Sequence, residues 1–451
     1  MKTELFNAFS PVTSKQWKQR IQFDLNGADY NDTLVWNTNE DIAVKPFYHA
    51  EDLANLPETI TSSPSHWHIC ETIYVADVIK SNQSALKAIK KGADSIKFII
   101  PNLSVSIEDL LKHIDTTSIP VHLELQFISE DFVIPTKAGI YLHTDIIGNL
   151  AKSGNWFSTL NTDFDQFENI VKSTNTFSID ASLYQNAGAN MVQQLAYALA
   201  HANEYLNRLD TAEDSLKQNT TCIFNISIGS NYFFEIAKLR ALRLLWTTLA
   251  TEYNFNTNCH IYATPTKRNK TLYDYNTNLL RTTTECMSAI LGGSDTICNL
   301  PYDAIYHKVN EFGSRMARNQ LLILKHESYF DKVNNPADGA YYIETITNQL
   351  AEKALELFKN IEANGGFLKQ LKEGTIQRKI KESADKEQQQ FNAGDMVLTG
   401  TNKHANPSDK MKDNLELYPF VKTNPRKTLI EPIIEKRLSE ALEQERLKRE
   451  G

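Results

Sequence analysis

The stretch that decides the fold opens with Cys222-Ile-Phe-Asn-Ile-Ser-Ile228, which is short, apolar and rich in β-branched residues. This composition is typical of a buried strand. Gly229-Ser-Asn231 then interrupts the strand. Ser230 or Asn231 is expected to cap the next helix, because a short side-chain oxygen accepts hydrogen bonds from the free N–H groups of the first turn. The stretch therefore predicts a strand followed directly by a helix.

A long helix and two further strands follow in the same stretch. The helix expected over Tyr232–Tyr253 has two apolar faces at helical spacing, which favours cover on two sides. A strand over Cys259–Ala263 comes next, then a helix from about Tyr275 to Leu291 that ends at Gly292-Gly293, and a strand over Asp295–Leu300. Strands that alternate with helices indicate right-handed βαβ units and a parallel sheet.

Strand and helix segments also alternate through the part of the chain that precedes this stretch. The strands expected over the whole alternating region are Glu71–Ala76, Ser95–Ile100, Val121–Phe127, Ala138–Leu142, Thr176–Asp180, Cys222–Ile228, Cys259–Ala263 and Asp295–Leu300. Helices are expected between them, for example over Ser84–Lys91, Ser106–His113 and Ala189–Leu206. Eight strands joined by crossover helices make up a (β/α)8 TIM barrel. We therefore predict an α/β fold with the barrel over residues 66–330.

Three further segments flank this barrel. Residues 1–65 are predicted to form an N-terminal arm, with a helix over Ser14–Leu25 that Ser14 caps. The arm is too short to bury a core of its own, so it packs either on the barrel or on a partner. Residues 331–425 are predicted to form a helical extension packed on the barrel. Residues 426–451 form a charged C-terminal tail, which we interpret as a solvated helix.

The composition argues against several classes of function. The 451 residues carry a formal net charge of −8, which disfavours nucleic-acid binding and a basic membrane-binding surface. The five cysteines are scattered and form no C-x-x-C pair, so we expect reduced, buried thiols in a cytoplasmic protein, without a metal site. Met1–Ser10 lacks an apolar core, and no run of about 18 apolar residues occurs, so neither a signal peptide nor a transmembrane helix is expected.

Four motifs in the second half of the chain carry a family resemblance. They are Phe233–Ala241 followed by Arg243-Leu-Leu-Trp246, Leu280-Arg-Thr-Thr-Thr-Glu285, Arg315-Met-Ala-Arg-Asn319, and Asn335-Pro-Ala-Asp-Gly-Ala-Tyr-Tyr-Ile-Glu344. In this order the motifs resemble the acyl-CoA mutase family, whose type case is methylmalonyl-CoA mutase. The resemblance runs over most of the chain and implies an adenosylcobalamin-dependent carbon-skeleton isomerase family. It also implies that the N-terminal arm embraces a second subunit.

The resemblance places candidate site residues in the loops after the strands. His143 stands where catalytic subunits have a substrate-contacting glutamine, although a packed histidine is an equal alternative. Tyr262 stands at the position of a histidine that donates to the thioester carbonyl, and Thr264 and Lys267 replace a glutamine and a glycine. His260 is expected to face inward but deeper. We therefore expect no catalytic residue, and a vestigial substrate-pocket rim of His143, Tyr262, Thr264 and Lys267.

The cobalamin-binding motif of the family is missing as well. No Asp-x-His-x-x-Gly hexapeptide, whose histidine ligates cobalt, occurs in the sequence, so we expect neither a cobalamin-binding domain nor a bound cofactor on this chain. His66 and His68 lack an evident third ligand, so no metal site is expected there. The resemblance then implies a small, non-catalytic subunit. Its large partner would carry adenosylcobalamin, in a heterodimer that interconverts (R)-methylmalonyl-CoA and succinyl-CoA.

Two alternatives stay open on the sequence alone. The chain could be a substrate-binding subunit that works with a separate cobalamin protein, as in isobutyryl-CoA mutase. Such a subunit should keep the catalytic histidine, and Tyr262 at that position argues against it. The chain could also be a free-standing CoA-thioester-binding module with a regulatory role. A longer partner that carries both missing motifs would distinguish the heterodimer from these two alternatives.

Overall fold

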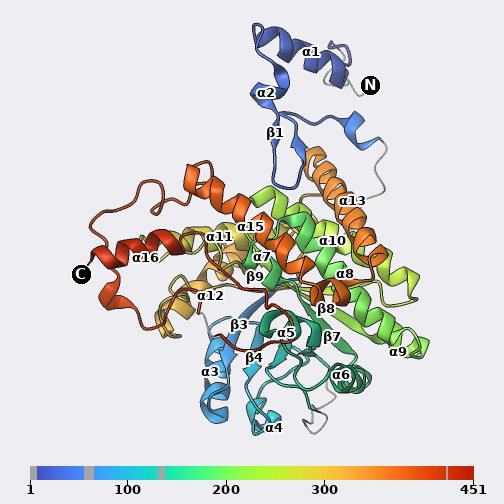
Figure 1. The fold of residues 1–451 in the computed structure, drawn as a ribbon, viewed down its shortest axis with the longest axis vertical. Coiled ribbons are helices and arrows are strands. Elements are labelled where there is room, and N and C mark those ends of the chain that lie inside the picture. Colours follow the sequence, from blue (N-terminus) through green and yellow to red (C-terminus); the bar gives the residue numbers. More distant parts are fainter. Residues whose placement is uncertain (1–7, 55–65, 130–131, 133–137, 423–424, 451) are drawn as a thin grey trace.

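An eight-stranded parallel sheet lies at the centre of the computed structural model, which describes residues 8–54, 66–129, 132, 138–422 and 425–450. Its strands are β3 (His68–Tyr74), β4 (Ser95–Ile100), β5 (Val121–Leu125), β6 (Ile140–His143), β7 (Thr176–Asp180), β8 (Thr221–Ile228), β9 (Cys259–Pro265) and β10 (Thr296–Cys298). Helices cover the outside of this sheet (Figure 1). The predicted α/β class and TIM barrel are confirmed.

The strand order β6-β5-β4-β3-β10-β9-β8-β7 leaves one seam, between β6 and β7. Across this seam the Ser178 N–H donates to the Thr144 carbonyl over 3.2 Å, and the Leu142 N–H donates to Thr176 Oγ1 over 3.2 Å. The barrel is therefore nearly closed. β8 and β9, which correspond to the first two strands of the stretch quoted above, are hydrogen-bonded in parallel along their length.

Helices and one small hairpin make up the rest of the described structure. The helices are α1 (Ser14–Asp24), α2 (Tyr30–Leu34), α3 (Val78–Lys90), α4 (Ile107–Leu110), α5 (Ile146–Ser153), α6 (Leu160–Thr174), α7 (Ser182–Ala187), α8 (Met191–Leu209), α9 (Asp214–Asn219), α10 (Tyr232–Glu252), α11 (Thr277–Leu291), α12 (Glu311–His326), α13 (Tyr341–Ala363), α14 (Phe367–Lys372), α15 (Thr375–Ala393) and α16 (Glu440–Arg449). The hairpin pairs β1 (Trp36–Asn37) with β2 (Ala43–Val44). Two short 3-10 helices span Ala50–Leu53 and Lys412–Asn414.

The main core lies between the barrel strands and helices α8, α10 and α13. Trp246 of α10 is fully buried and meets the rings of Phe224 and Phe255 edge-on, with centroids 5.5 and 6.2 Å apart. α10 also packs against α13, on its other side from the sheet. The expectation that this helix is covered on two sides is confirmed. Covering both apolar faces removes them from water, which stabilises the fold.

Several expected boundaries were wrong by a few residues, for identifiable reasons. β3 begins at His68 rather than Glu71, because its first residues pair with β10. α3 begins at Val78 rather than Ser84, because the carboxylate of Asp77 caps its first turn. The segment Lys80-Ser-Asn-Gln83 is polar, so the apolar pattern did not show that the helix begins before it.

Two expected helix caps were also wrong. Thr13 rather than Ser14 caps α1, in a capping box with Gln16. Neither Ser230 nor Asn231 caps α10 with its side chain. Glu235 lies in the first turn of α10 instead, and its carboxylate accepts from the Gly229 N–H over 2.7 Å. A carboxylate near the positive end of a helix is stabilised there, so Glu235 and not a short polar side chain complements the start of α10.

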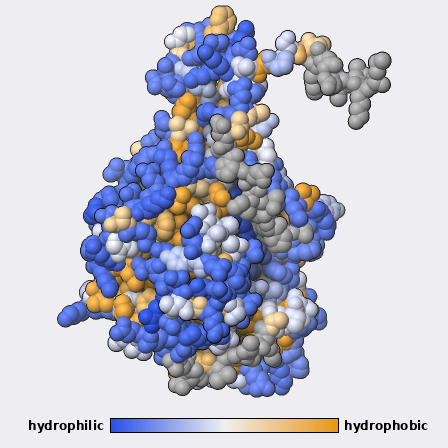
Figure 2. All heavy atoms as spheres, turned by 90° about the vertical axis from the view of Figure 1, so that its right-hand side faces the viewer, coloured by the Kyte–Doolittle hydropathy of each residue, from blue (hydrophilic) through white to orange (hydrophobic). Residues whose placement is uncertain are grey.

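The outer part of the N-terminal arm, with α1 and α2, stands clear of the barrel as a lobe with hydrophobic side chains among its hydrophilic ones (Figures 1 and 2). α1 buries none of its residues. Phe9, Trp17 and Phe23 are 75%, 50% and 73% exposed, respectively. Trp17 stacks on Phe47 with ring centroids 5.3 Å apart, which fixes α1 to the rest of the arm. The arm therefore presents apolar surface that the described part of the chain leaves uncovered.

The C-terminal tail packs on the barrel, so its interpretation as a solvated helix was wrong. Ile430 and Ile433 are buried in the main core. Arg437 and Glu443 form a buried ion pair 2.7 Å apart. Glu443 also accepts from the Leu272 N–H over 2.8 Å, which ties the start of α16 to the loop after β9.

Candidate functional site

A pocket opens where the barrel strands end at their C-terminal sides. Its volume is about 450 Å³, within the ~300–1,000 Å³ typical of small-molecule sites. Its lining comes mainly from β3, β4, β5, β7, β8, β9 and β10, from α5, α7 and α12, and from Leu417 and Glu435 in the C-terminal part of the chain. Barrel proteins place their active sites at this end of the strands, so this pocket is the candidate functional site.

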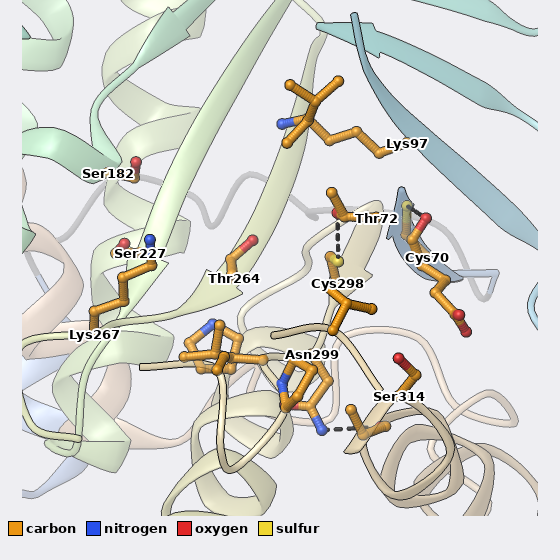
Figure 3. A pocket seen from close by; sticks show the side chains of 18 of the residues that line it. Cys70, Thr72, Lys97, Ser182, Ser227, Thr264, Lys267, Cys298, Asn299 and Ser314 are labelled. Atoms are coloured by element: carbon orange, nitrogen blue, oxygen red, sulfur yellow. Dashed lines mark hydrogen bonds between the residues drawn. The ribbon is translucent and has the colours of Figure 1, made fainter. Parts of the chain in front are cut away.

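Three of the four expected rim residues line this pocket: Tyr262 and Thr264 from β9, and Lys267 from the loop that follows. Figure 3 shows Thr264 and Lys267 on one wall. The fourth, His143, is not part of the pocket lining. It is buried inside the barrel, where its Nε2 lies 2.9 Å from Nδ1 of His122. His143 is thus the packed histidine that the sequence allowed as an alternative.

Aromatic rings fill the barrel axis beneath the pocket. The ring of His122 lies at the centre of this ring cluster, 5.0 Å from Tyr262, 5.1 Å from Tyr141 and from His143, and 5.3 Å from His260, centroid to centroid. His260 faces inward, as expected, and its Nε2 lies 2.9 Å from Oγ1 of Thr296. The ring cluster closes the axis, so a ligand in the pocket reaches no further into the barrel than Tyr262.

Burial keeps the three histidines of the ring cluster neutral. Desolvation is the main cause that lowers the pKa of His122, His143 and His260 below the ordinary value. Neighbouring histidines and the ammonium of Lys97 add to the effect at His122 and His143. The neutral rings pack and hydrogen-bond, and no cationic donor faces the pocket from this cluster at neutral pH.

Acidification is expected to destabilise the barrel through these histidines. Their folded pKa values lie below the unfolded value of about 6.5, so the unfolded chain binds more protons below pH 6.5 and stability falls as the pH falls. Each histidine contributes at most about 1.4 kcal/mol per pH unit. We expect His143→Gln to reduce the loss of stability between pH 7.5 and pH 5.5 in urea unfolding, whereas His66→Gln, at an exposed position, leaves it unchanged. Equal losses in the two variants would contradict this assignment.

An ion pair between the buried Lys97 and the partly exposed Glu124 stands on the pocket wall next to Tyr262. Lys97 Nζ lies 2.6 Å from a carboxylate oxygen of Glu124 and 4.6 Å from the centroid of the Tyr262 ring. Burial disfavours the Lys97 ammonium, but Glu124 outweighs it and the pKa of Lys97 is raised. Lys97 in turn is the main cause that lowers the pKa of Glu124. The two charges compensate each other, so neither is a free general acid or base.

Sequence reasoning missed the polar residues that the strands direct into the pocket. Besides Lys97 and Glu124, these include Cys70, Thr72 and Cys298. A signal was present, because Lys97 in Ser-Ile-Lys-Phe-Ile-Ile, and Glu124 in Val-His-Leu-Glu-Leu, interrupt otherwise apolar strands. In a barrel, alternate strand positions face the interior, so a polar residue in such a strand marks an inward position.

The pocket residues do not fit the role of a cobalt ligand. His307 lies on the pocket wall, with Nδ1 3.2 Å from Asp303 and Nε2 3.2 Å from Asn414, so both ring nitrogens are engaged. Among the residues that the structure describes, no group of three or more His, Cys, Asp or Glu side chains is placed to hold a metal ion. Within the same residues, no helix has the length and apolar character needed to cross a membrane.

The fold and the pocket together define a class: a (β/α)8-barrel protein with a small-molecule-sized pocket at the C-terminal ends of its strands and an axis closed by rings. Comparison with known proteins then gives the family, because residues 120–448 match the family model described as Methylmalonyl-CoA mutase. The chain belongs to the methylmalonyl-CoA mutase family.

Three relatives show how far this similarity extends. The methylmalonyl-CoA mutase small subunit of Porphyromonas gingivalis is 33% identical over 455 residues, covering 92% of this chain and 73% of that protein. The small subunit of Streptomyces virginiae is 26% identical, covering 82% of this chain and 67% of that protein. The methylmalonyl-CoA mutase of Rhizobium meliloti is 36% identical over 255 residues, which cover 54% of this chain and 35% of that protein. The match thus spans most of the two small subunits but about a third of the R. meliloti protein.

Proposed function

We propose that this chain is the small, non-catalytic subunit of a heterodimeric methylmalonyl-CoA mutase. The proposal rests on Tyr262, which the family resemblance places where catalytic barrels have the histidine that donates to the thioester carbonyl. Its ring is buried between His122, His143 and the Lys97 ammonium. A side chain packed in this way fills the axis instead of presenting a donor to a substrate. Two relatives named as small subunits match most of this chain.

The proposal assigns the reaction to a larger partner subunit. That partner would hold adenosylcobalamin, which supplies the radical chemistry of the interconversion of (R)-methylmalonyl-CoA and succinyl-CoA. Both ring nitrogens of His307 on the pocket wall are engaged, so this side chain is not placed to ligate cobalt. The contribution of this chain is a folded barrel and an interface. We place the complex in the cytoplasm, because all five cysteines of this chain are free and buried.

The N-terminal arm is the proposed contact with the partner. Its base is anchored to this chain: the side-chain amides of Asn39 and Gln390 exchange two hydrogen bonds of 2.9 Å, and the rings of Tyr48 and Tyr342 lie 5.3 Å apart. Its tip carries the exposed apolar side chains on α1. A rigid base with an uncovered apolar tip is the arrangement expected of an arm that a second subunit covers.

Co-purification tests the proposed function directly. The tagged chain is expected to retain a larger, cobalamin-binding protein of the same family when it is isolated from its own organism. With adenosylcobalamin and methylmalonyl-CoA, we expect no turnover by the isolated chain and full turnover after the larger protein is added. Turnover by this chain alone, or full activity of the larger protein without it, would contradict the proposal.

Replacing Tyr262 by Phe in the assembled complex is expected to change turnover by less than about 2-fold. Loss of one donor at a reacting carbonyl typically costs ~10²–10³ in rate. The phenol of Tyr262 does not occupy such a place, because its contacts are Cys70 at 3.4 Å and Thr72 at 3.5 Å. Thr264→Val, at another position on the pocket wall, is the matched variant and should be equally silent. A large loss in Tyr262→Phe would show that this barrel takes part in the chemistry.

A further inference from the structure

Two cysteines face each other at the mouth of the barrel. Cys298 on β10 and Cys70 on β3 are paired residues of neighbouring parallel strands. Both are free and both line the pocket. A disulfide needs Cα atoms about 4.4–6.8 Å apart, and hydrogen-bonded strands lie about 4.7–4.9 Å apart. Two cysteines that are paired in register on adjacent strands therefore meet the backbone requirement for a disulfide.

Hydrogen-bond donors converge on this cysteine pair. Oγ1 of Thr72 lies 3.1 Å from Sγ of Cys298, and Figure 3 shows the two side chains joined across the pocket floor. The hydroxyl of Tyr262 donates to Sγ of Cys70 over 3.4 Å. Lys97 places its ammonium 4.6 Å above the Tyr262 ring. Hydroxyl donors and a nearby cation stabilise a thiolate, which is the nucleophilic form of cysteine.

These contacts give Cys298 a lower pKa than that of the other cysteines. Hydrogen bonding from Cys70, together with that from Thr72 and Tyr262 and the charge of Lys97, lowers the pKa of Cys298 to about 6 against the effect of burial. At Cys259 burial is the main cause of the shift, and it raises the pKa to about 12. The negative charge is therefore favoured on Cys298 rather than on Cys70, whose pKa burial raises.

We propose that Cys298 and Cys70 form a redox-active dithiol at the barrel mouth, which reacts with low-molecular-weight disulfides through Cys298. The pocket gives such a ligand room, since its volume is about 450 Å³ and both cysteines are among the residues that line it. Cys222, Cys259 and Cys286 are buried and lie outside the pocket lining. The site is independent of the proposed subunit role, because it uses neither the arm nor a substrate of the mutase.

The reaction balances as two thiol–disulfide exchanges. In the first, the Cys298 thiolate attacks one sulfur of the small disulfide, forms a mixed disulfide and releases one small thiolate. In the second, Cys70 loses its proton and attacks Sγ of Cys298, which forms the Cys70–Cys298 disulfide and releases the second small thiol. The two cysteines are oxidised by two electrons, and one molecule of the small disulfide is reduced.

Glutathione disulfide tests this reaction on the full-length chain, with peptide mapping after acid quenching. We expect the Cys70–Cys298 disulfide in the wild type. Cys70→Ser should accumulate a stable mixed disulfide at Cys298, because the second step is blocked. Cys298→Ser should leave Cys70 unmodified, and Cys259→Ser, the matched control, should behave as the wild type. Absence of the internal disulfide from the wild type, or equal modification of Cys70 in Cys298→Ser, would overturn the proposal.

Alkylation of the unsubstituted protein provides a test that needs no folded variant. Iodoacetamide should modify Cys298 at pH 7 at least about 100-fold faster than Cys259, because the thiolate is the reacting species. The rate at Cys298 should rise with pH through a midpoint near 6. A rate at Cys298 no greater than that at Cys259 would overturn the assignment of Cys298 as the nucleophile.

Discussion

Deleting residues 1–34 is expected to abolish association with the larger subunit and to leave the barrel folded. The deletion removes α1 and α2 but keeps the β1–β2 hairpin that anchors the base of the arm. α1 buries nothing in this chain, while Trp17 and Phe23 are 50% and 73% exposed. Aromatic side chains that act as interface hot spots typically cost about 2 kcal/mol or more each when they are removed, and Trp17 and Phe23 are the candidates here. Loss of two of them should weaken the complex by more than about 100-fold.

A pair of point variants separates the arm from apolar surface in general. Phe23→Ser removes one exposed apolar side chain from α1. Leu103→Ser removes another, 53% exposed, from the loop between β4 and α4. In Figure 1, α4 lies at the end of the molecule opposite α1. We expect sedimentation analysis to show a weakened complex for Phe23→Ser and an unchanged one for Leu103→Ser. Wild-type affinity in the deletion variant would refute the arm as the interface.

The strands could be predicted from the sequence wherever the segment is apolar and bounded by turn residues. Ser95–Ile100 and Thr176–Asp180 were predicted with the ends that the structure has. β3 was predicted to start late, because His68 is polar and its place in the sheet depends on β10, more than two hundred residues away in the chain. The local pattern of apolar residues indicates that a segment is buried. Where the strand begins and ends depends on the strands that pair with it, which are far away in the sequence.

The packing of the C-terminal tail could not be predicted for the same reason. Arg437 and Glu443 belong to a run of charged residues that is typical of a solvated helix. Glu443 nevertheless binds the backbone N–H of Leu272, and Arg437 donates to the Lys270 carbonyl over 2.9 Å. A charge run has the same local sequence whether its partners are water or a loop far away in the chain. The sequence therefore carries no signal for this contact.

The candidate site was predictable in part. Alignment with the family motif placed Tyr262, Thr264 and Lys267 on the pocket, and all three lie there. The same alignment placed His143 on the rim, whereas its side chain enters the ring cluster below. Cys70 and Cys298 lie far apart in the sequence, and they become neighbours because β10 pairs with β3. A motif identifies positions within one loop, but it cannot show which strands meet across a barrel.

Replacing Lys238 by Met is expected to destabilise the chain by about 3–5 kcal/mol, because removal of one partner leaves a buried charge uncompensated. Lys238 and Glu235 lie one turn apart on α10, 2% and 0% exposed, with the ammonium 2.5 Å from the carboxylate. The ammonium also donates to Gln185 over 3.0 Å, Gln194 over 3.0 Å and the Ser227 carbonyl over 2.8 Å. Urea unfolding at neutral pH measures the loss.

A double variant shows whether the uncompensated charge or the lost contacts cause this effect. Glu235→Gln in the Lys238→Met background removes the carboxylate charge but keeps an acceptor for the Gly229 N–H. If the buried charge dominates, the double variant should be more stable than Lys238→Met alone, a coupling of the sign expected for residues in contact. Lys359→Met, at an exposed position on α13, is the matched control and should change stability by no more than about 0.5 kcal/mol. A double variant no more stable than Lys238→Met would assign the loss to the three broken hydrogen bonds of the ammonium instead of to the charge of Glu235.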